Sequence, residues 1–276
     1  MPMRHDRTTR ILLVLLCTLT VALATLTVVF LVTKYAPSGN GRAEETATDT
    51  EAGPLAPVIG AHDDVILPET PDAGMSYQDS LTFVGDSLTA HLISRGVLSG
   101  GTATTQVWRT ESNMLNLKPG INAQTIIFPG PGVQTGTLMT VAEAAALAKP
   151  KTLIVTLGTD WGVAYFDEKE DFVACYADFI RGIQKASPST TVVVQSIFPV
   201  TASCRVLSNA QIDRANEWVK AVASETGCYY LDTQSALKGE DGCLRAEYCN
   251  STDGIHLGVA GYEAILAYIR THAVTN

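Results

Sequence analysis

Short apolar runs alternate with amphipathic stretches from Leu81 to the end of the chain. Five runs have the length and β-branched content of buried strands, and they lie at 81–85, 104–109, 152–158, 191–197 and 228–232. Five stretches have helical spacing of apolar residues, and they lie at 87–98, 140–149, 168–186, 208–225 and 259–273. This alternation predicts an α/β domain, a three-layer α/β/α sandwich with a five-stranded parallel sheet. A further apolar run at 125–129 is a candidate for a short hairpin strand.

The N-terminal region contains a different pattern. Residues 11–33 carry no charged side chain and are numerous enough to cross a bilayer as one helix. Arg4, Arg7 and Arg10 precede this run, which predicts a cytoplasmic tail at 1–10, a transmembrane anchor at 11–33 and an extracytoplasmic remainder. The alternative is a cleaved signal peptide, since Ala22-Leu23-Ala24 matches a cleavage site. Cleavage there leaves an apolar mature N-terminus, so we expect a single-pass protein of the cell membrane.

The segment from 34 to 78 is rich in Pro, Gly, Thr, Ala and acidic residues and has no periodic apolar positions. Such composition is typical of a flexible tether. We therefore expect one folded domain at 79–276, spaced from the membrane by this tether.

The net charge of the chain bears on which kinds of molecule it binds. The chain of 276 residues has a formal net charge of −9 at pH 7. A nucleic-acid surface needs clustered Lys and Arg, so we expect no nucleic-acid partner. The charge does not select a substrate.

Five of the six cysteines lie beyond the predicted anchor. An oxidising compartment favours disulfides, and the odd number leaves one thiol over. Cys243 and Cys249 share a short loop and are the expected pair. We expect Cys175 and Cys228 to be inert thiols inside the fold, and Cys204 is compatible with either state.

Ser87 follows the first predicted strand and begins a helix, in the segment Gly85-Asp86-Ser87. In parallel sheets, ligands bind beyond the carboxyl ends of the strands, where this residue lies. A serine here can simply cap the helix. The same position also sets a hydroxyl beside unpaired backbone N–H groups, which stabilise an oxyanion.

Asp253 and His256 follow the last predicted strand and precede the final helix. A serine hydroxyl needs a base to remove its proton, and a histidine serves best when its other ring nitrogen is held by a carboxylate. Gly254 permits the turn that brings Asp253 to the ring of His256. Together with Ser87, this pair predicts nucleophilic serine chemistry.

The segments FVGDSLT (83–89), LGTDWG (157–162) and DGIHLGVAGYEAI (253–265) resemble the three sequence blocks of the SGNH/GDSL hydrolases in order and spacing. The resemblance spans about 81–273. It implies a flavodoxin-like sheet, ester hydrolysis through an acyl-enzyme, and no metal or organic cofactor. It further implies Ser87 as nucleophile, His256 as general base and then acid, Asp253 as the residue that orients it, and the Ser87 N–H as an oxyanion donor.

Two positions depart from the family pattern. Asp160 stands where the family has an asparagine whose amide donates to the oxyanion, and an ionised carboxylate has no donor. Either Asp160 is protonated, or a nearby backbone N–H takes its role, or activity is reduced. The family's oxyanion glycine is also missing after the second strand. Asn113 is the nearest substitute, because asparagine tolerates left-handed backbone.

Other residues near these blocks have simpler interpretations. His91 lies one helical turn after Ser87, and we expect a partly exposed residue that takes no part in the chemistry. Trp161, Tyr165 and Phe166 either floor a substrate pocket or pack in the core. Thr89 replaces the second glycine of a G-x-S-x-G elbow, which disfavours an α/β-hydrolase.

The sequence therefore predicts an extracytoplasmic serine ester hydrolase on a membrane anchor. Its expected substrate is an ester or O-acetylated compound, either surface polysaccharide or lipid. Two alternatives remain, an acyltransferase to sugar hydroxyls and a catalytically weakened carbohydrate-binding module.

Overall fold

A computed structural model of the chain describes residues 65–129, 136–159 and 161–275. The predicted anchor at 11–33 and residue Asp160 lie outside these ranges. Among the helices of the described ranges, none is both long and apolar enough to cross a membrane.

The central sheet confirms the predicted five parallel strands. The strands are β1 (Leu81–Gly85), β2 (Val107–Trp108), β5 (Thr152–Thr156), β6 (Thr191–Gln195) and β7 (Tyr229–Leu231). Their order in the sheet is β2-β1-β5-β6-β7, and every neighbouring pair is parallel. This is the flavodoxin-like order. The chain adds β2 on one side of β1 and then adds β5, β6 and β7 on the other side. Ligands of such folds bind beside the carboxyl ends of the two strands where this change occurs, here β1 and β5.

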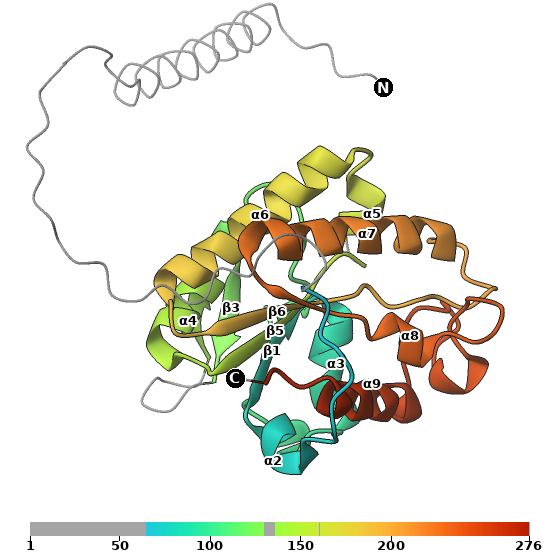
Figure 1. The fold of residues 1–276 in the computed structure, drawn as a ribbon, viewed down its shortest axis with the longest axis horizontal. Helices are drawn as coiled ribbons and strands as arrows, with labels where there is room; N and C mark the ends of the chain where they lie inside the picture. Colours follow the sequence, from blue (N-terminus) through green and yellow to red (C-terminus); the bar gives the residue numbers. More distant parts are fainter. Residues whose placement is uncertain (1–64, 130–135, 160, 276) are drawn as a thin grey trace, which may run out of the picture. The chain divides into compact units, whose positions relative to one another are not determined.

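Alternate residues of each strand face opposite helical layers. Phe83 and Ile154 belong to one core cluster, while their neighbours Val84 and Val155 belong to the other. The first face is covered by α3 (Ser87–Arg95) and α9 (Val259–Thr271). The second is covered by α4 (Val141–Ala148), α6 (Lys169–Ala186) and α7 (Asn209–Thr226). Figure 1 shows α6 and α7 on one side of β5 and β6, with α3 and α9 on the other.

Local sequence explains where two of the helices, α4 and α7, begin. Thr140 and Glu143 form a reciprocal capping box at the start of α4, and Ser208 and Gln211 form another at the start of α7. The remaining short elements are α2 (Gly74–Asp79), η1 (Gly101–Ala103), η2 (Ile121–Ala123), α5 (Gly162–Tyr165), α8 (Gln234–Leu237) and η3 (Ala246–Tyr248).

A two-stranded antiparallel sheet lies outside the main sheet. It consists of β3 (Thr125–Phe128) and β4 (Thr137–Thr140), with Ile126 opposite Met139. The candidate hairpin strand at 125–129 is therefore present. Its partner begins at Thr137, three residues before the expected helix at 140–149.

The predicted tether was too long at its C-terminal end. Its described part, 65–78, is folded against the domain. Val65 and Leu67 are buried, and Tyr230 of β7 exchanges backbone hydrogen bonds with both of them, at 2.6 and 2.9 Å. The segment thus extends the sheet edge beside β7, and α2 then packs against α9. Backbone hydrogen bonds from Thr70 to Thr271 and from Ala73 to Arg270 hold the segment as well. Two alternate apolar residues are too short a pattern to give a periodic signal in the sequence.

The expected Cys243–Cys249 disulfide is absent, and both residues are free thiols. Cys243 lies next to Leu244, which forms an isolated backbone β-bridge with Lys238. Cys249 forms a separate backbone β-bridge with Leu257. The turn η3 separates these two bridges, so closeness in sequence does not bring the thiols together. Cys228 is buried as expected, whereas Cys175 is only partly buried. Burial raises the pKa of each thiol to about 11.

Candidate active site

Ser87 lies at the carboxyl end of β1, one of the two strands beside which ligands of such folds bind. Asp86 is the N-cap of α3, and its carboxylate accepts a hydrogen bond from the Leu88 N–H at 3.1 Å. The capping interpretation of Ser87 is therefore wrong, because the residue before it performs that task. The Ser87 hydroxyl instead lies with its Oγ 3.3 Å from Nε2 of His256.

His256 lies between Ser87 and Asp253, as the sequence predicted. Nδ1 of His256 is 2.7 Å from Oδ2 of Asp253. A carboxylate only accepts hydrogen bonds, so this contact places the ring proton on Nδ1 and leaves the Nε2 lone pair directed at Ser87. The three side chains thus form a continuous series of hydrogen bonds, although Ser87 and His256 are 169 residues apart in the sequence.

Asp253 is held in the ionised form by its own loop. Desolvation by itself raises the pKa of this carboxyl group, but hydrogen bonds outweigh it. The Ser251 hydroxyl, the Ile255 N–H and the ring and backbone N–H groups of His256 all donate to it. They hold the pKa of Asp253 well below its usual value. The carboxylate therefore stays charged wherever His256 acts as a base.

The loop that carries Asp253 and His256 is fixed against the loop after β6. The Thr201 N–H donates to the carbonyl of Gly254 at 2.9 Å. Gly254 has a φ of +77°, and a Cβ atom there would lie 2.3 Å from Oγ1 of Thr201. Only glycine provides both the left-handed backbone and the space, so the close approach of the two loops depends on it.

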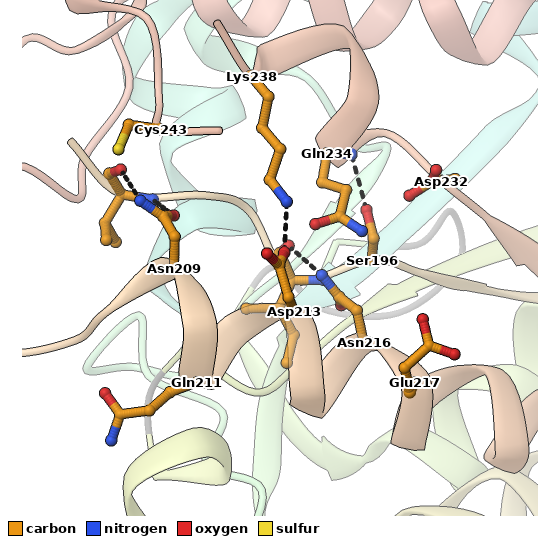
Figure 2. A network of polar contacts seen from close by, with 12 residues as sticks. Ser196, Asn209, Gln211, Asp213, Asn216, Glu217, Asp232, Gln234, Lys238 and Cys243 are labelled. Atoms are coloured by element: carbon orange, nitrogen blue, oxygen red, sulfur yellow. Dashed lines mark hydrogen bonds and ion pairs between the residues drawn. The ribbon is translucent and has the colours of Figure 1, made fainter. Parts of the chain in front are cut away.

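Two asparagines of α7 hold the loop after β6 in place (Figure 2). The Asn216 side chain accepts from the Ile197 N–H at 2.7 Å and donates to the Ile197 carbonyl at 3.0 Å. Asn209 pairs in the same way with Val200, at 2.9 and 2.8 Å. Asn216 is fully buried, so it satisfies two backbone groups that water does not reach. These pairs connect α7 to the residues that contact the Asp253–His256 loop.

A buried chain of polar side chains joins the ends of the central strands. The Thr156 hydroxyl donates to Gln195 at 2.6 Å, and Gln195 donates to Thr233 at 2.9 Å. The Ser196 hydroxyl accepts from the Gln234 N–H at 2.9 Å, a contact visible in Figure 2. The carboxyl ends of β5, β6 and β7 are thereby linked, which gives the site a rigid base.

A cavity of about 340 Å³ opens beside Ser87 and His256. Its other lining residues are Thr159, Trp161, Ala164, Tyr165, Val206, Leu207 and Ile255. Of the two interpretations of the aromatic residues, Trp161 and Tyr165 line this cavity, whereas Phe166 is buried in the core. Apart from His256, the described lining residues carry no charge.

The structure bears differently on the two residues, Asn113 and Asp160, that were expected to help bind the oxyanion. Asn113 does have left-handed backbone, with a φ of +61°. Its N–H, however, donates to the Thr110 carbonyl at 3.0 Å, so it is already occupied in this structure. Asp160 lies outside the described residues. The Ser87 N–H at the start of α3 remains as an expected donor, whereas the Leu88 N–H donates to the Asp86 carboxylate.

Sequence reasoning missed several neighbours of the site. His91 is not remote from the chemistry, because its ring centroid lies 4.8 Å from that of His256. The four-residue step from Ser87 to His91 on one helix was a usable signal. Ser251, two residues before Asp253, was another, since short polar side chains often bond within such turns. Thr201 and Val206 left no local signal.

Comparisons with known proteins place the chain in a family. The model of the GDSL-like lipase/acylhydrolase family matches residues 83–264, which is most of the described domain. No curated protein sequence matches the chain. Among solved structures, a GDSL-like lipase from Bacteroides thetaiotaomicron is 16% identical, with 70% of this chain and 87% of that one covered and a TM-score of 0.45.

Two further structures are similar at the same low level. An acetylxylan esterase from Geobacillus stearothermophilus is 16% identical, covering 77% of this chain and 98% of that one, with a TM-score of 0.43. A peptidoglycan O-acetylesterase is 15% identical, covering 47% of this chain and 38% of that one, with a TM-score of 0.40. On the extent of the family match, the chain belongs to the GDSL-like lipase/acylhydrolase family and is a carboxylic ester hydrolase.

Proposed function

We propose that this chain is an extracytoplasmic serine ester hydrolase that acts through an acyl-enzyme. Ser87 is the nucleophile, His256 is the general base and then acid, and Asp253 orients His256. The observation that supports this most directly is the unbroken line of contacts from Ser87 Oγ through both ring nitrogens of His256 to Asp253.

The chemistry follows from that line. Ser87 Oγ attacks the ester carbonyl carbon while its proton passes to Nε2 of His256. The resulting imidazolium is stabilised by the ionised Asp253. His256 then protonates the departing alcohol, which leaves an acyl group on Ser87. A water molecule, deprotonated by His256, attacks this acyl group and releases the acid, and Ser87 recovers its proton.

The oxyanion of each tetrahedral intermediate forms at the N-terminus of α3. The Ser87 N–H at the start of this helix is the proposed donor, and the positive end of the helix dipole favours negative charge there. A second donor comes from the segment around Thr159, which lines the same cavity. Asp160 occupies the family's donor position in the sequence, and its replacement by asparagine tests this part of the proposal.

The cavity favours neutral esters. A volume of about 340 Å³ far exceeds an acetyl group, so the cavity also receives part of the alcohol or a longer acyl chain. Trp161 and Tyr165 are about half exposed on its wall and offer apolar ring surface to a sugar or to a hydrocarbon chain. O-acetylated surface polysaccharide and lipid esters are the two substrate classes that these features support.

The cellular location rests on the N-terminal sequence. The uncharged run at 11–33 and the arginines before it support a cytoplasmic N-terminus and a catalytic domain on the outer side. There, an anchored hydrolase meets surface polymers and membrane lipids directly.

Fluorophosphonate labelling tests the nucleophile. The full-length chain in detergent should be labelled at Ser87 and should hydrolyse 4-nitrophenyl acetate. Ser87→Ala should abolish both with little change in Tm, and Ser94→Ala, at an exposed serine of the same helix, should change neither. Ester hydrolysis by Ser87→Ala at more than about 1% of the wild-type rate contradicts the mechanism, since loss of a triad serine costs far more.

Substrate preference then follows from a series of esters. Rates on 4-nitrophenyl acetate, butyrate and octanoate compare acyl lengths, and an acetylated xylo-oligosaccharide tests a sugar ester. Released free acid is the expected product even when a sugar acceptor is added, and a product acylated on the added sugar argues against hydrolysis as the main reaction.

A further inference from the structure

His91 contacts the ring of His256 but belongs to no hydrogen bond of the proposed mechanism. Its ring centroid lies 4.8 Å from that of His256, with 41° between the ring planes. Because α3 turns once in about four residues, His91 follows Ser87 on the same face of the helix. One helix therefore presents both the nucleophile and a ring that packs against the base.

The two hydrogen bonds of His256 restrain its ring unequally. Ser87 holds Nε2 and Asp253 holds Nδ1, at 3.3 and 2.7 Å. The contact to Asp253 is short, whereas the 3.3 Å contact to Ser87 is long for a hydrogen bond and restrains Nε2 only weakly. A second ring packed against the imidazole restricts its rotation about the Cβ–Cγ bond, which is the motion that carries Nε2 toward or away from Ser87.

The side chain of His91 makes no hydrogen bond to another residue of the described ranges. Its Nδ1 is buried and has no hydrogen-bond partner among the described residues. Burial lowers the pKa of His91, and His256 and Arg95 lower it further, while Asp253 acts in the opposite direction. A neutral ring at this position does not repel the imidazolium that forms on His256.

We propose that His91 is a positioning residue, which holds the His256 imidazole between Ser87 and Asp253 through ring contact. This inference rests on the proposed function, because it assigns His91 a role through the proposed base. On this proposal, full activity requires a planar ring at position 91 but does not require the nitrogen atoms of that ring.

Two substitutions separate the ring from its nitrogens. His91→Ala should lower kcat on 4-nitrophenyl acetate about 10- to 100-fold and leave KM within about twofold, as expected when a reacting group is misplaced. His91→Phe keeps a planar ring and removes the unpaired Nδ1, so kcat should return to within about threefold of wild type.

A second histidine of the chain provides the control. His272 stacks on Tyr268 with ring centroids 3.7 Å apart, at the end of α9. His272→Ala removes a histidine ring contact that has no part in the site, so kcat should stay within about twofold even where Tm falls.

An NMR spectrum of the His256 ring tests the contact with His91 independently of catalysis. Long-range ¹H–¹⁵N spectra of the full-length wild type in detergent should show His256 as one neutral tautomer with its proton on Nδ1. His91→Ala should broaden this signal or mix the tautomers, and His91→Phe should restore it.

The two proposals fail in different ways. Wild-type activity and labelling at Ser87, together with a His91→Ala variant that keeps its kcat and its His256 spectrum, overturn the role of His91 alone. A His91→Phe variant as impaired as His91→Ala overturns it too, since the nitrogen and not the ring would then matter. A wild type that neither turns over esters nor labels at Ser87 contradicts the proposed function, while the His256 spectrum still tests the contact.

Discussion

The backbone N–H of Thr201 donates to the carbonyl of Gly254 at 2.9 Å, which joins the loop after β6 to the loop that carries Asp253 and His256. This contact links two segments about 50 residues apart at the point where the proposed base is held. It requires a left-handed glycine, since a Cβ at position 254 would overlap Oγ1 of Thr201. The geometry of the proposed triad therefore depends on residues that have no chemical role.

Replacement of this glycine tests the dependence. Gly254→Ala should lower kcat at least tenfold, because the strained backbone and the clash with Thr201 displace the loop. Gly242→Ala is the matched control: Gly242 has nearly the same φ, +73°, but open space around its Cβ position. It should lose only about 1 kcal/mol of stability and keep its kcat. Equal kcat values for the two variants on 4-nitrophenyl acetate would refute the loop argument.

Asp253→Asn tests the charge on the carboxylate. The variant should lower kcat about 10²- to 10⁴-fold, because the amide no longer stabilises the imidazolium or selects the Nδ1–H tautomer. Rates measured at saturating ester across the pH range provide the check. A variant with wild-type kcat at every pH would remove Asp253 from the proposed mechanism.

The same carboxylate makes a prediction about stability and pH. Its folded-state pKa lies below the unfolded value of about 3.9, so ionised Asp253 stabilises the fold above that pH. The contribution is lost as the pH falls through the lower folded-state value. Tm plotted against pH should therefore fall less steeply below about pH 4 in Asp253→Asn than in the wild type. Parallel curves in thermal melts would contradict the assigned shift.

Asn216→Ala should destabilise the whole domain. The substitution leaves the Ile197 N–H and carbonyl unpaired in the core, at a cost of about 3 kcal/mol, or a Tm lower by roughly 6–12 °C. Asn209→Ala should cost less, since the Val200 pair is only partly buried. Calorimetry of both variants distinguishes them, and an Asn216→Ala Tm within about 2 °C of wild type speaks against a structural role for the pair.

Asp160→Asn tests the departure at the family's oxyanion position. An amide supplies the neutral donor that an ionised carboxylate lacks, so the rate at neutral pH should rise about tenfold, equivalent to about 1.4 kcal/mol. Pre-steady-state acylation rates with 4-nitrophenyl acetate measure this step directly. An unchanged or lower rate at all pH values means that backbone N–H groups already fill the oxyanion site.

Membrane fractionation tests the proposed anchor. If 11–33 spans the bilayer uncleaved, the full-length chain should remain in the membrane fraction through a carbonate wash. Protease added to intact cells or spheroplasts should then release the domain. A soluble form that begins at Thr25 would instead establish cleavage of a signal peptide after Ala24.

The sequence by itself determined the class of fold and the candidate reacting groups. Apolar runs with β-branched residues and helices with apolar stripes were local patterns, so the five strands and the long helices were predictable to within a few residues. Ser87 and the Asp253–His256 pair were visible because each lies directly after a strand, and parallel strands bring their carboxyl ends to one edge.

Tertiary structure decided what depends on contacts between distant segments. The ring of His91 packs against that of His256, and Val65 and Leu67 pair with β7. Cys243 and Cys249 stay apart because separate backbone bridges hold them. Residue types and spacing report propensity along the chain, whereas these outcomes depend on the direction in which each side chain and N–H group points after packing, and packing is set by the whole core.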